Sequence, residues 1–185
     1  HLENDANCVG LSELLAHPEI ENAACVVIGT GIGGAMIING KLHRGRHGLG
    51  GEFGYMTTLA PTEKLNNWSQ LASTGSMVRY VNEKSGQSDW DGRKIYQEAV
   101  AGNVLCQEAI ERMNRNLAQG LLNIQYLIDP DVISLGGSIS QNPDFIKGVQ
   151  KAVDAFVERY EEYTIAPVIQ ACTYHADANL YGALV

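Results

Sequence analysis

The residues with the clearest chemical potential lie in three short segments near the start of the chain. Asn4-Asp5 pairs an amide with a carboxylate, and a carboxylate can accept a proton from a hydroxyl group. The cluster Gly29-Thr30-Gly31-Ile32-Gly33-Gly34 offers backbone amides with few side chains around them, a pattern that can line an anion. Glu52, within the glycine-rich stretch 50–54, supplies a second carboxylate. Each segment also has a purely structural interpretation: Asp5 as a helix cap or turn residue, and Glu52 as an exposed loop residue.

The glycine cluster satisfies G-x-G-x-x-G, the fingerprint of dinucleotide binding, and Glu52 follows downstream. That fingerprint requires a helix after the glycines, because the helix N-terminus meets the pyrophosphate. Here an apolar run over 35–38 and the turn pair Asn39-Gly40 follow, which predict a strand and a hairpin. The dinucleotide interpretation therefore fails. Two others stay open: a loop that presents Thr30 and its neighbouring amides to a phosphate, or a plain hairpin with glycines at positive φ.

The elements around these segments indicate an α/β protein. Apolar runs bounded by turn residues predict strands over 24–28, 35–38, 132–135 and 165–171. Apolar residues at steps of three and four predict helices over 9–16, 68–81, 104–128, from 143 onward and over 178–184. Asn103 and Asn142 are expected to cap two of these helices, Gly120 indicates close packing, and a polar turn is expected around 85–91. A mixed sheet with covering helices fits this order.

Composition and charge argue against several classes of function. The 185 residues include 13 Lys+Arg and 21 Asp+Glu, a formal net charge of −8, so nucleic acid is not expected as a partner. No apolar run approaches the roughly 18 residues of a membrane span. The four cysteines are scattered without a C-x-x-C pair, which is typical of reduced thiols in a cytoplasmic protein. The first residues carry no start signal, and we expect the chain to be the later part of a longer polypeptide.

Four segments in this order resemble the ROK family of repressors, open reading frames and sugar kinases. They are Glu-Asn-Asp-Ala-Asn-Cys at 3–8, the glycine cluster at 29–34, Gly-Gly-Glu-Phe-Gly at 50–54, and the segment 129–138. Each is weak alone, but the ordered set is specific and extends from residue 4 to the end of the chain. The resemblance implies an actin-like (ribonuclease H-like) ATPase or sugar-kinase lobe, with ATP and Mg²⁺ supplying the phosphoryl group to a hexose hydroxyl.

On the sugar side, the resemblance assigns roles to three residues. Asp5 matches the catalytic base, which accepts the proton of the sugar hydroxyl as its oxygen attacks the γ-phosphorus. Asn4 and Glu52 match positions that hydrogen-bond sugar hydroxyls, which are both donors and acceptors.

On the nucleotide side, two glycine-containing loops match family motifs. Thr30 and Gly31 match the second phosphate loop. Gly136, Gly137 and Ser138 match a glycine stretch near the adenosine moiety, although a simple strand-to-loop turn explains these three residues nearly as well.

The chain departs from the family pattern after the third motif. The family has a His directly after G-E-x-G and a downstream C-x-C-G-x-x-G-C-x-E segment, which together bind a structural zinc and position the sugar. Tyr55 stands at the His position, and no cysteine lies between it and Ser73, so we expect no zinc. The family's sugar-binding Glu falls near Ser69. Tyr55 is expected either to contact the sugar, by a hydrogen bond or by stacking on its ring, or to be a core aromatic beside Phe53.

The family's first phosphate loop, an Asp-x-Gly-Gly-Thr type motif of the N-terminal lobe, is missing. We therefore expect residues 1–185 to form a single C-terminal, larger lobe that is inactive alone, because phosphoryl transfer depends on positioning. The complete protein is expected to phosphorylate a hexose, amino sugar or β-glucoside with ATP, as a homodimer without a membrane partner. Two alternatives stay open: the sugar-sensing effector domain of a ROK transcriptional repressor, with a helix-turn-helix upstream, or a catalytically idle sugar binder.

Overall fold

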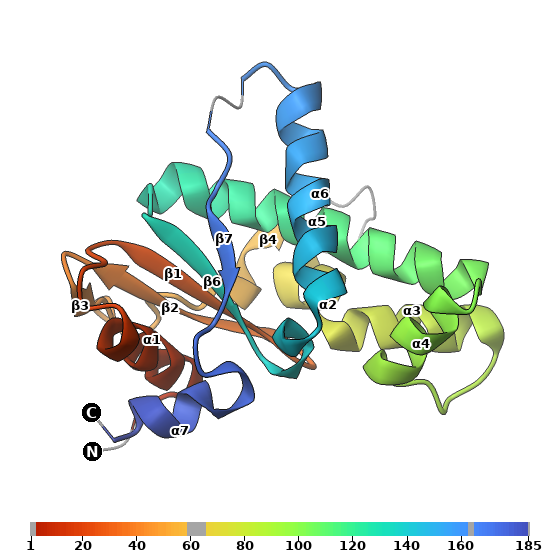
Figure 1. The fold of residues 1–185 in the computed structure, drawn as a ribbon, viewed down its shortest axis with the longest axis horizontal. Helices are drawn as coiled ribbons and strands as arrows, with labels where there is room; N and C mark the ends of the chain where they lie inside the picture. Colours follow the sequence, from red (N-terminus) through yellow and green to blue (C-terminus); the bar gives the residue numbers. More distant parts are fainter. Residues whose placement is uncertain (1–2, 59–65, 163–164, 185) are drawn as a thin grey trace.

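The computed structural model describes residues 3–58, 66–162 and 165–184, and a five-stranded mixed sheet forms its centre (Figure 1). The strands are β1 (Ala23–Ile28), β2 (Ile32–Ile38), β3 (Lys41–Leu42), β6 (Val132–Gly136) and β7 (Ile169–Ala171). In the order β3-β2-β1-β6-β7, the β1–β6 and β6–β7 pairs are parallel, and the other two pairs are antiparallel. A two-stranded ribbon pairs β4 (Thr57–Thr58) with β5 (Asn66–Asn67). The predicted α/β class with a mixed sheet is confirmed.

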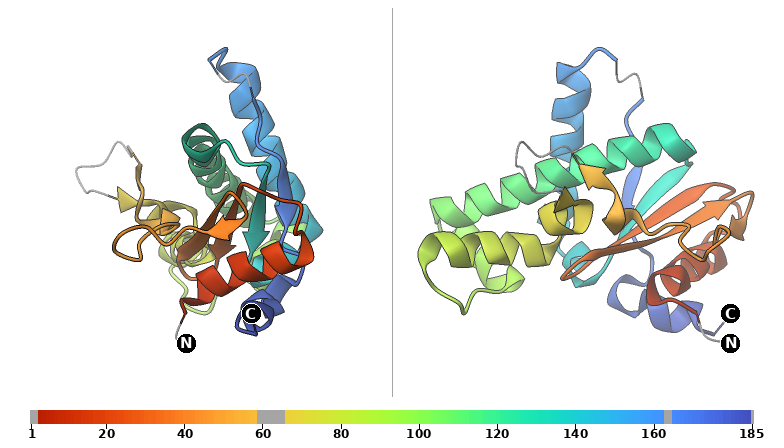
Figure 2. Two further views of the ribbon diagram at one scale, coloured as in Figure 1. Left: turned by 90° about the vertical axis from the view of Figure 1, so that its left-hand side faces the viewer. Right: turned by 180° about the vertical axis from the view of Figure 1, so that it is seen from behind.

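Helices cover both faces of this sheet. Successive residues of β1 point to opposite sides and are apolar on both, so each face has a core to bury. Val26 faces a large core that the sheet shares with the long helix α5, whereas Cys25 faces a smaller core that it shares with α1 and α7. The side and back views separate these layers, with α1 and α7 on one side and α5 on the other (Figure 2). The helices are α1 (Asp5–Ala16), α2 (Trp68–Ala72), α3 (Thr74–Ser85), α4 (Gly92–Val100), α5 (Val104–Ile128), α6 (Pro143–Arg159) and α7 (Ala178–Gly182), with 3-10 turns η1 (Phe53–Tyr55), η2 (Ser138–Gln141) and η3 (His175–Asp177).

The long helix α5 has the predicted bounds, and the packing around it fixes part of the site. The Asn103 side chain caps it by accepting hydrogen bonds from the backbone amides of Leu105 and Cys106. Gly120 packs directly on the buried Trp68 indole, where any Cβ would collide with the ring. The predicted reason for this glycine is therefore confirmed, and α2 is held against α5. Among the described residues, no helix combines the length and apolarity that crossing a membrane requires.

Several predicted boundaries are wrong, and capping side chains explain most of the differences. The first helix begins at Asp5 rather than residue 9, because Asn4 caps it. The single helix predicted over 68–81 is two helices, broken at Ser73, whose hydroxyl caps α3 by accepting the Ser76 amide. The strand predicted over 165–171 is confined to Ile169–Ala171, and the last helix stops at Gly182. Helix α4 was not predicted.

Other local predictions are confirmed by the backbone. Asn142 caps α6 with Pro143 at its first turn. The pair Asn39-Gly40 joins β2 to β3 as a two-residue hairpin turn, with φ of 51° and 68°. The polar turn expected around 85–91 separates α3 from α4.

Candidate active site

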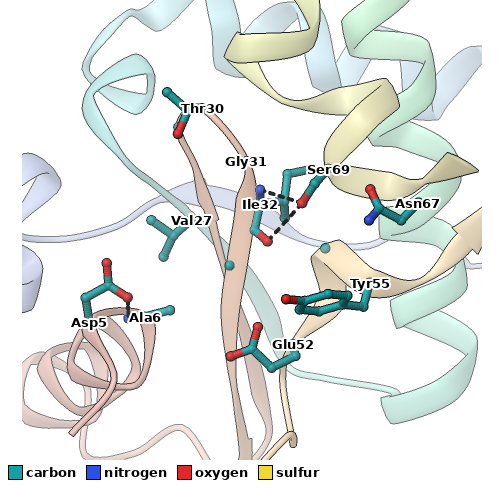
Figure 3. Close-up of a pocket in the computed structure, with 13 residues that line it drawn as sticks. Asp5, Ala6, Val27, Thr30, Gly31, Ile32, Glu52, Tyr55, Asn67 and Ser69 are labelled. Atoms are coloured by element: carbon teal, nitrogen blue, oxygen red, sulfur yellow. Dashed lines mark hydrogen bonds between the residues drawn. The ribbon is translucent and has the colours of Figure 1, made fainter.

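One open cavity of about 470 Å³ collects most of the residues that the sequence singled out. It lies between the start of α1, the turn joining β1 to β2, and the segment from η1 to α2 (Figure 3). Its lining includes Asp5, Thr30, Gly31, Glu52, Tyr55 and Ser69. The site also lies where β1 ends, the edge at which α/β sheets commonly bind ligands. Residues far apart in the sequence therefore share one concave surface.

Asn4 and Asp5 have different tasks at the N-terminus of α1. The Asn4 Oδ1 caps the helix by accepting hydrogen bonds from the backbone amides of Ala6 at 2.8 Å and Asn7 at 3.4 Å. Asp5 is the first helical residue, is exposed, and accepts a 2.8 Å hydrogen bond from the Ala6 amide through Oδ1. Its other carboxylate oxygen has no hydrogen bond within the described residues. That oxygen is therefore available to take a proton from a ligand.

Glu52 comes close to Asn4 from 48 residues away. The Asn4 amide donates a 3.3 Å hydrogen bond from Nδ2 to Glu52 Oε1, so the two predicted sugar-binding side chains lie together. A second link supports this approach: Arg44 pairs with Glu3 at 2.6 Å, and Glu3 accepts a 2.8 Å hydrogen bond from Asn7. The hydrogen bonds from Asn7 and Arg44 lower the pKa of Glu3. The loop that carries Glu52 is thus tied to the start of α1.

The turn at Gly29–Gly31 matches the phosphate-loop interpretation better than the plain hairpin. Its carbonyls are anchored: the Gly29 oxygen accepts from the Gly75 amide at 3.2 Å, and the Thr30 oxygen accepts from the Ser73 hydroxyl at 3.0 Å. Within the described residues, the amides of Thr30 and Gly31 donate no hydrogen bond. The hairpin alternative expects glycines at positive φ, but neither Gly29 nor Gly31 has one. Two free amides beside a cavity can meet an anion.

The second glycine segment lies apart from this cavity. Gly136 ends β6 and Gly137 follows at a φ of 89°, where a Cβ would collide with the carbonyl of Ile28. Ser138 lines a separate cavity of about 670 Å³, which Tyr96 also lines. The backbone alone thus requires a glycine at Gly137, and the contact of Gly136, Gly137 and Ser138 with a nucleotide stays a prediction.

Tyr55 and Ser69, the two departures from the family pattern, have contrasting environments. Tyr55 is 74% exposed at the rim of the first cavity, so the core-aromatic alternative is wrong. The Ser69 hydroxyl accepts a hydrogen bond from the Ile32 amide at 2.8 Å and donates one to the Ile32 carbonyl at 3.2 Å. Through one accepted and one donated hydrogen bond, Ser69 joins α2 to β2.

Several residues that shape the two cavities were not anticipated. Ser73 and Gly75 anchor the Gly29–Gly31 turn, and a Cβ on Gly75 would collide with the Thr30 carbonyl. In the sequence, the only indication of this role is the Ser-Thr-Gly run at 73–75. It lies inside a predicted helix, where a glycine lowers helix stability. Tyr96 comes from α4, an element that the sequence did not reveal. Its hydroxyl is buried and has no hydrogen-bond partner among the described residues, and burial raises the pKa of Tyr96 above its ordinary range.

A structural metal site needs several donor side chains that converge on one point. Across the described residues, no group of three or more His, Cys, Asp or Glu side chains is placed to hold a metal ion. Residues 59–65, within the segment that carries the family's zinc ligands, lie outside the described residues. The expected absence of zinc stays a prediction.

Known proteins match this chain over its whole length. A model of the ROK family matches residues 1–185. A ROK family protein from Streptococcus pneumoniae TIGR4, solved in complex with sucrose, is 91% identical with a TM-score of 0.96, and the match covers 100% of this chain and 64% of that chain. A ROK family glucokinase from Streptomyces griseus, in complex with glucose and AMPPNP, is 27% identical with a TM-score of 0.82, over 98% of this chain and 66% of that chain.

A curated relative gives the same picture. The β-glucoside kinase of Listeria monocytogenes is 32% identical over 190 residues, which cover 99% of this chain and 63% of that protein. The chain thus spans less than two thirds of the length of this relative. The family match and the structural neighbours agree on one assignment: the chain belongs to the ROK family, and its α/β structure has the actin-like fold of ROK sugar kinases.

Proposed function

We propose that the chain is the C-terminal, larger lobe of a kinase that transfers a phosphoryl group from ATP to a hydroxyl of a hexose-type sugar. The observation that carries this proposal is the shared cavity. Within the described residues, it combines a carboxylate with one oxygen that makes no hydrogen bond (Asp5), a second carboxylate joined to an amide (Glu52 with Asn4), and two backbone amides that donate no hydrogen bond in the turn at 29–31. A base, hydroxyl ligands and an anion site are the groups that this reaction needs.

In the proposed reaction, Asn4 and Glu52 orient the sugar by hydrogen bonds to its hydroxyls. The Asp5 carboxylate accepts the proton of the reacting hydroxyl as that oxygen attacks the γ-phosphorus and the bond to the ADP oxygen breaks. Thr30 and the Gly31 amide contact the phosphate chain, whose extra negative charge they stabilise. Ser138, on the second cavity, contacts the adenosine end.

Mg²⁺ fits this arrangement as an ion delivered with the nucleotide. Such ions are usually held by one or two carboxylates plus substrate phosphates rather than by a complete protein cage. Asp5 and Thr30 both line the cavity, and their carboxylate and hydroxyl oxygens would hold such an ion. Bound there, the ion would neutralise charge on the phosphates.

The proposal includes a second lobe outside these residues. Because the Listeria relative is 63% covered, we infer that its remaining part corresponds to the lobe with the first phosphate loop. Residues 1–185 alone are then expected to be inactive, since half of the phosphate site is missing. All four cysteines are buried and free, which supports a reducing compartment such as the cytoplasm. The homodimer is a further prediction, testable by light scattering.

The test is a panel of sugars assayed with ATP through coupled ADP detection, on the complete protein. Turnover of at least one hexose-type sugar is expected. Sugar binding without turnover of any sugar would overturn the kinase proposal and favour the repressor or the idle binder. An upstream helix-turn-helix would then identify the repressor.

A further inference from the structure

The side chains proposed to bind the sugar come from two separate segments of the chain. Asp5 lies at the start of α1, and Glu52 lies beside Tyr55 on the segment that enters η1 (Figure 3). The direct link between the two segments is the 3.3 Å hydrogen bond from Asn4 to Glu52, which is long for its kind and exposed. A misplacement of about 1 Å can cost about 10²-fold in rate. A second link that fixes the separation of these segments would therefore matter for the reaction.

The Glu3 carboxylate provides such a link at the start of α1. Its Oε1 accepts hydrogen bonds from the Asn4 backbone amide at 3.0 Å and from Nδ2 of Asn7 at 2.8 Å. Its Oε2 accepts two more from Arg44, from Nε at 2.9 Å and from Nη2 at 2.6 Å. Asn7 is itself buried in the first turn of α1. Four donors thus converge on one carboxylate, and its place relative to α1 is fixed.

Arg44 lies at the base of a closed loop that leads directly to Glu52. The Arg44 carbonyl accepts a 2.8 Å hydrogen bond from the Gly50 amide, and a Cβ on Gly50 would collide with the Arg44 backbone. Gly51 follows with a φ of 89° and packs on the backbone of Ala35 in β2. The backbones of Arg44 and Glu52 therefore belong to one compact unit. A displacement of Arg44 is expected to displace Glu52 as well.

The ion pair is too exposed to add much to stability. The Arg44 side chain is 55% exposed and that of Glu3 is 24% exposed, and such pairs contribute little to the free energy of unfolding. Its position is more informative, because it joins the neighbour of Asn4 to the base of the loop that carries Glu52, across 41 residues.

We propose that Glu3 and Arg44 are positioning residues for the reaction: their ion pair holds the start of α1 and the Glu52 segment at one separation and thereby sets the affinity for the sugar. The inference rests on the proposed kinase function. Neither side chain needs to touch the sugar, since each acts through the sugar-binding residue next to it in the structure.

The first test measures the affinity of the complete protein for glucose and methyl β-glucoside by calorimetry, without ATP. Arg44→Gln should raise the Kd about fivefold, as expected for a displacement well below 1 Å. Arg46→Gln is the matched control: it removes the same charge from the same loop, and Arg46 forms no ion pair with any of the described residues. The control should bind like the unchanged protein. A Kd raised equally in both variants would contradict the ion pair as the cause.

A double-mutant cycle tests whether the two side chains act through each other. Glu3→Gln keeps an oxygen for the donors of Asn4 and Asn7 but removes the charge that pairs with Arg44. Each single variant should raise the sugar Kd about fivefold, and the double variant should be no worse than the weaker-binding single variant. The KM for ATP and the midpoint of urea unfolding should not change, whereas a general structural defect would alter both. Multiplied effects, about 25-fold in the double variant, would overturn the proposal.

Both sugars are uncharged, so salt acts on their binding only through the protein. Raising NaCl from 0.1 M to 1 M shortens the screening length from about 10 Å to about 3 Å and weakens exposed ion pairs. The Kd of the unchanged protein should rise about twofold to threefold, whereas that of Arg44→Gln should stay constant. The same salt dependence in both proteins would contradict the proposal.

Hydrogen exchange tests the positioning without any ligand. Several backbone amides between Gly50 and Tyr55 are hydrogen-bonded within this segment, so their exchange reports its local opening. Exchange over residues 50–55 should be about fivefold faster in Arg44→Gln, while α5 keeps its rate. Unchanged exchange would overturn the positioning, whatever the affinities.

Failure of the proposed function would be distinguishable from failure of this inference. Sugar binding without turnover of any sugar would refute the kinase, but the affinities of the variants would still decide the positioning. If neither sugar binds, exchange over residues 50–55 decides it alone.

Discussion

The two glycine loops of this lobe look alike in sequence but differ in what requires their glycines. The turn at 29–31 and the segment 136–138 both follow sheet strands, β1 and β6, which run parallel and end side by side. Gly137 has a positive φ and contacts the Ile28 carbonyl so closely that any side chain would collide. Gly29 has neither constraint, and a Cβ on Gly31 would meet only the Ser69 side chain, at 3.5 Å.

Glycines that the backbone requires can thus be told apart from glycines that leave room for a ligand. At Gly137 the backbone itself requires the missing side chain. At Gly31 the fold would accept a side chain, so the free space is better explained by a ligand that approaches the turn. The sequence alone does not distinguish a glycine that the backbone requires from one that leaves space for a ligand, because the residue is glycine in both.

The largest effect on stability is expected from Gly137→Ala. The strained φ and the collision with Ile28 should together cost about 2–4 kcal/mol of the free energy of unfolding. Urea unfolding followed by circular dichroism measures this loss. A Gly137→Ala variant as stable as the original protein would show that the backbone does not require a glycine at this position.

Gly31→Ala should give the opposite pattern. Its stability should stay within about 1 kcal/mol of the original, since φ is ordinary and the new methyl meets an ordinary contact distance. Catalysis should suffer, because a methyl group displaces the phosphate, and a shift of about 1 Å can cost about 10²-fold in rate. The readouts are kcat and the KM for ATP on the complete protein. Full activity of Gly31→Ala would show that the turn at 29–31 does not contact the phosphate.

A substitution at the second cavity, Tyr96→Phe, is expected to have a smaller effect than the two glycine substitutions. Tyr96→Phe removes a buried hydroxyl that has no partner in the part of the chain that the structure describes, so stability should be unchanged or rise by up to about 1 kcal/mol. If the hydroxyl bonds the nucleotide, the KM for ATP should rise about threefold to tenfold. A stable variant with an unchanged KM would show that the Tyr96 hydroxyl does not contact the nucleotide.

The sequence predicted the parts of the fold that depend on local signals. The bounds of α5 followed from apolar spacing and its Asn103 cap, and the β2–β3 hairpin followed from Asn39-Gly40. Helix α4 was missed because it spans only 9 residues of mostly polar sequence and buries only Ile95 fully, although its few apolar residues recur at helical spacing. The break at Ser73 was missed because its hydroxyl competes for the helix start, a choice that apolar spacing does not reveal.

For the site, the residue types were predictable but their environments were not. The motif order brought Asn4 and Glu52 to attention, and the structure joins them by a hydrogen bond. The roles of Tyr55 and Ser69 could not be separated in advance, since burial depends on how η1 and α2 pack on β2. The tertiary structure shows that Tyr55 is exposed, whereas the Ser69 hydroxyl is hydrogen-bonded to Ile32 of β2.

The most direct test of the account is the Asp5→Asn variant of the complete protein, with sugar affinity and turnover measured side by side. Asp5 is exposed, so the substitution should leave the fold intact while removing the group that accepts the proton. The account predicts a kcat lower by about 10²–10⁴-fold with sugar affinity retained. A kcat within about threefold of the original would contradict the assignment of Asp5 as the base and, with it, the proposed mechanism.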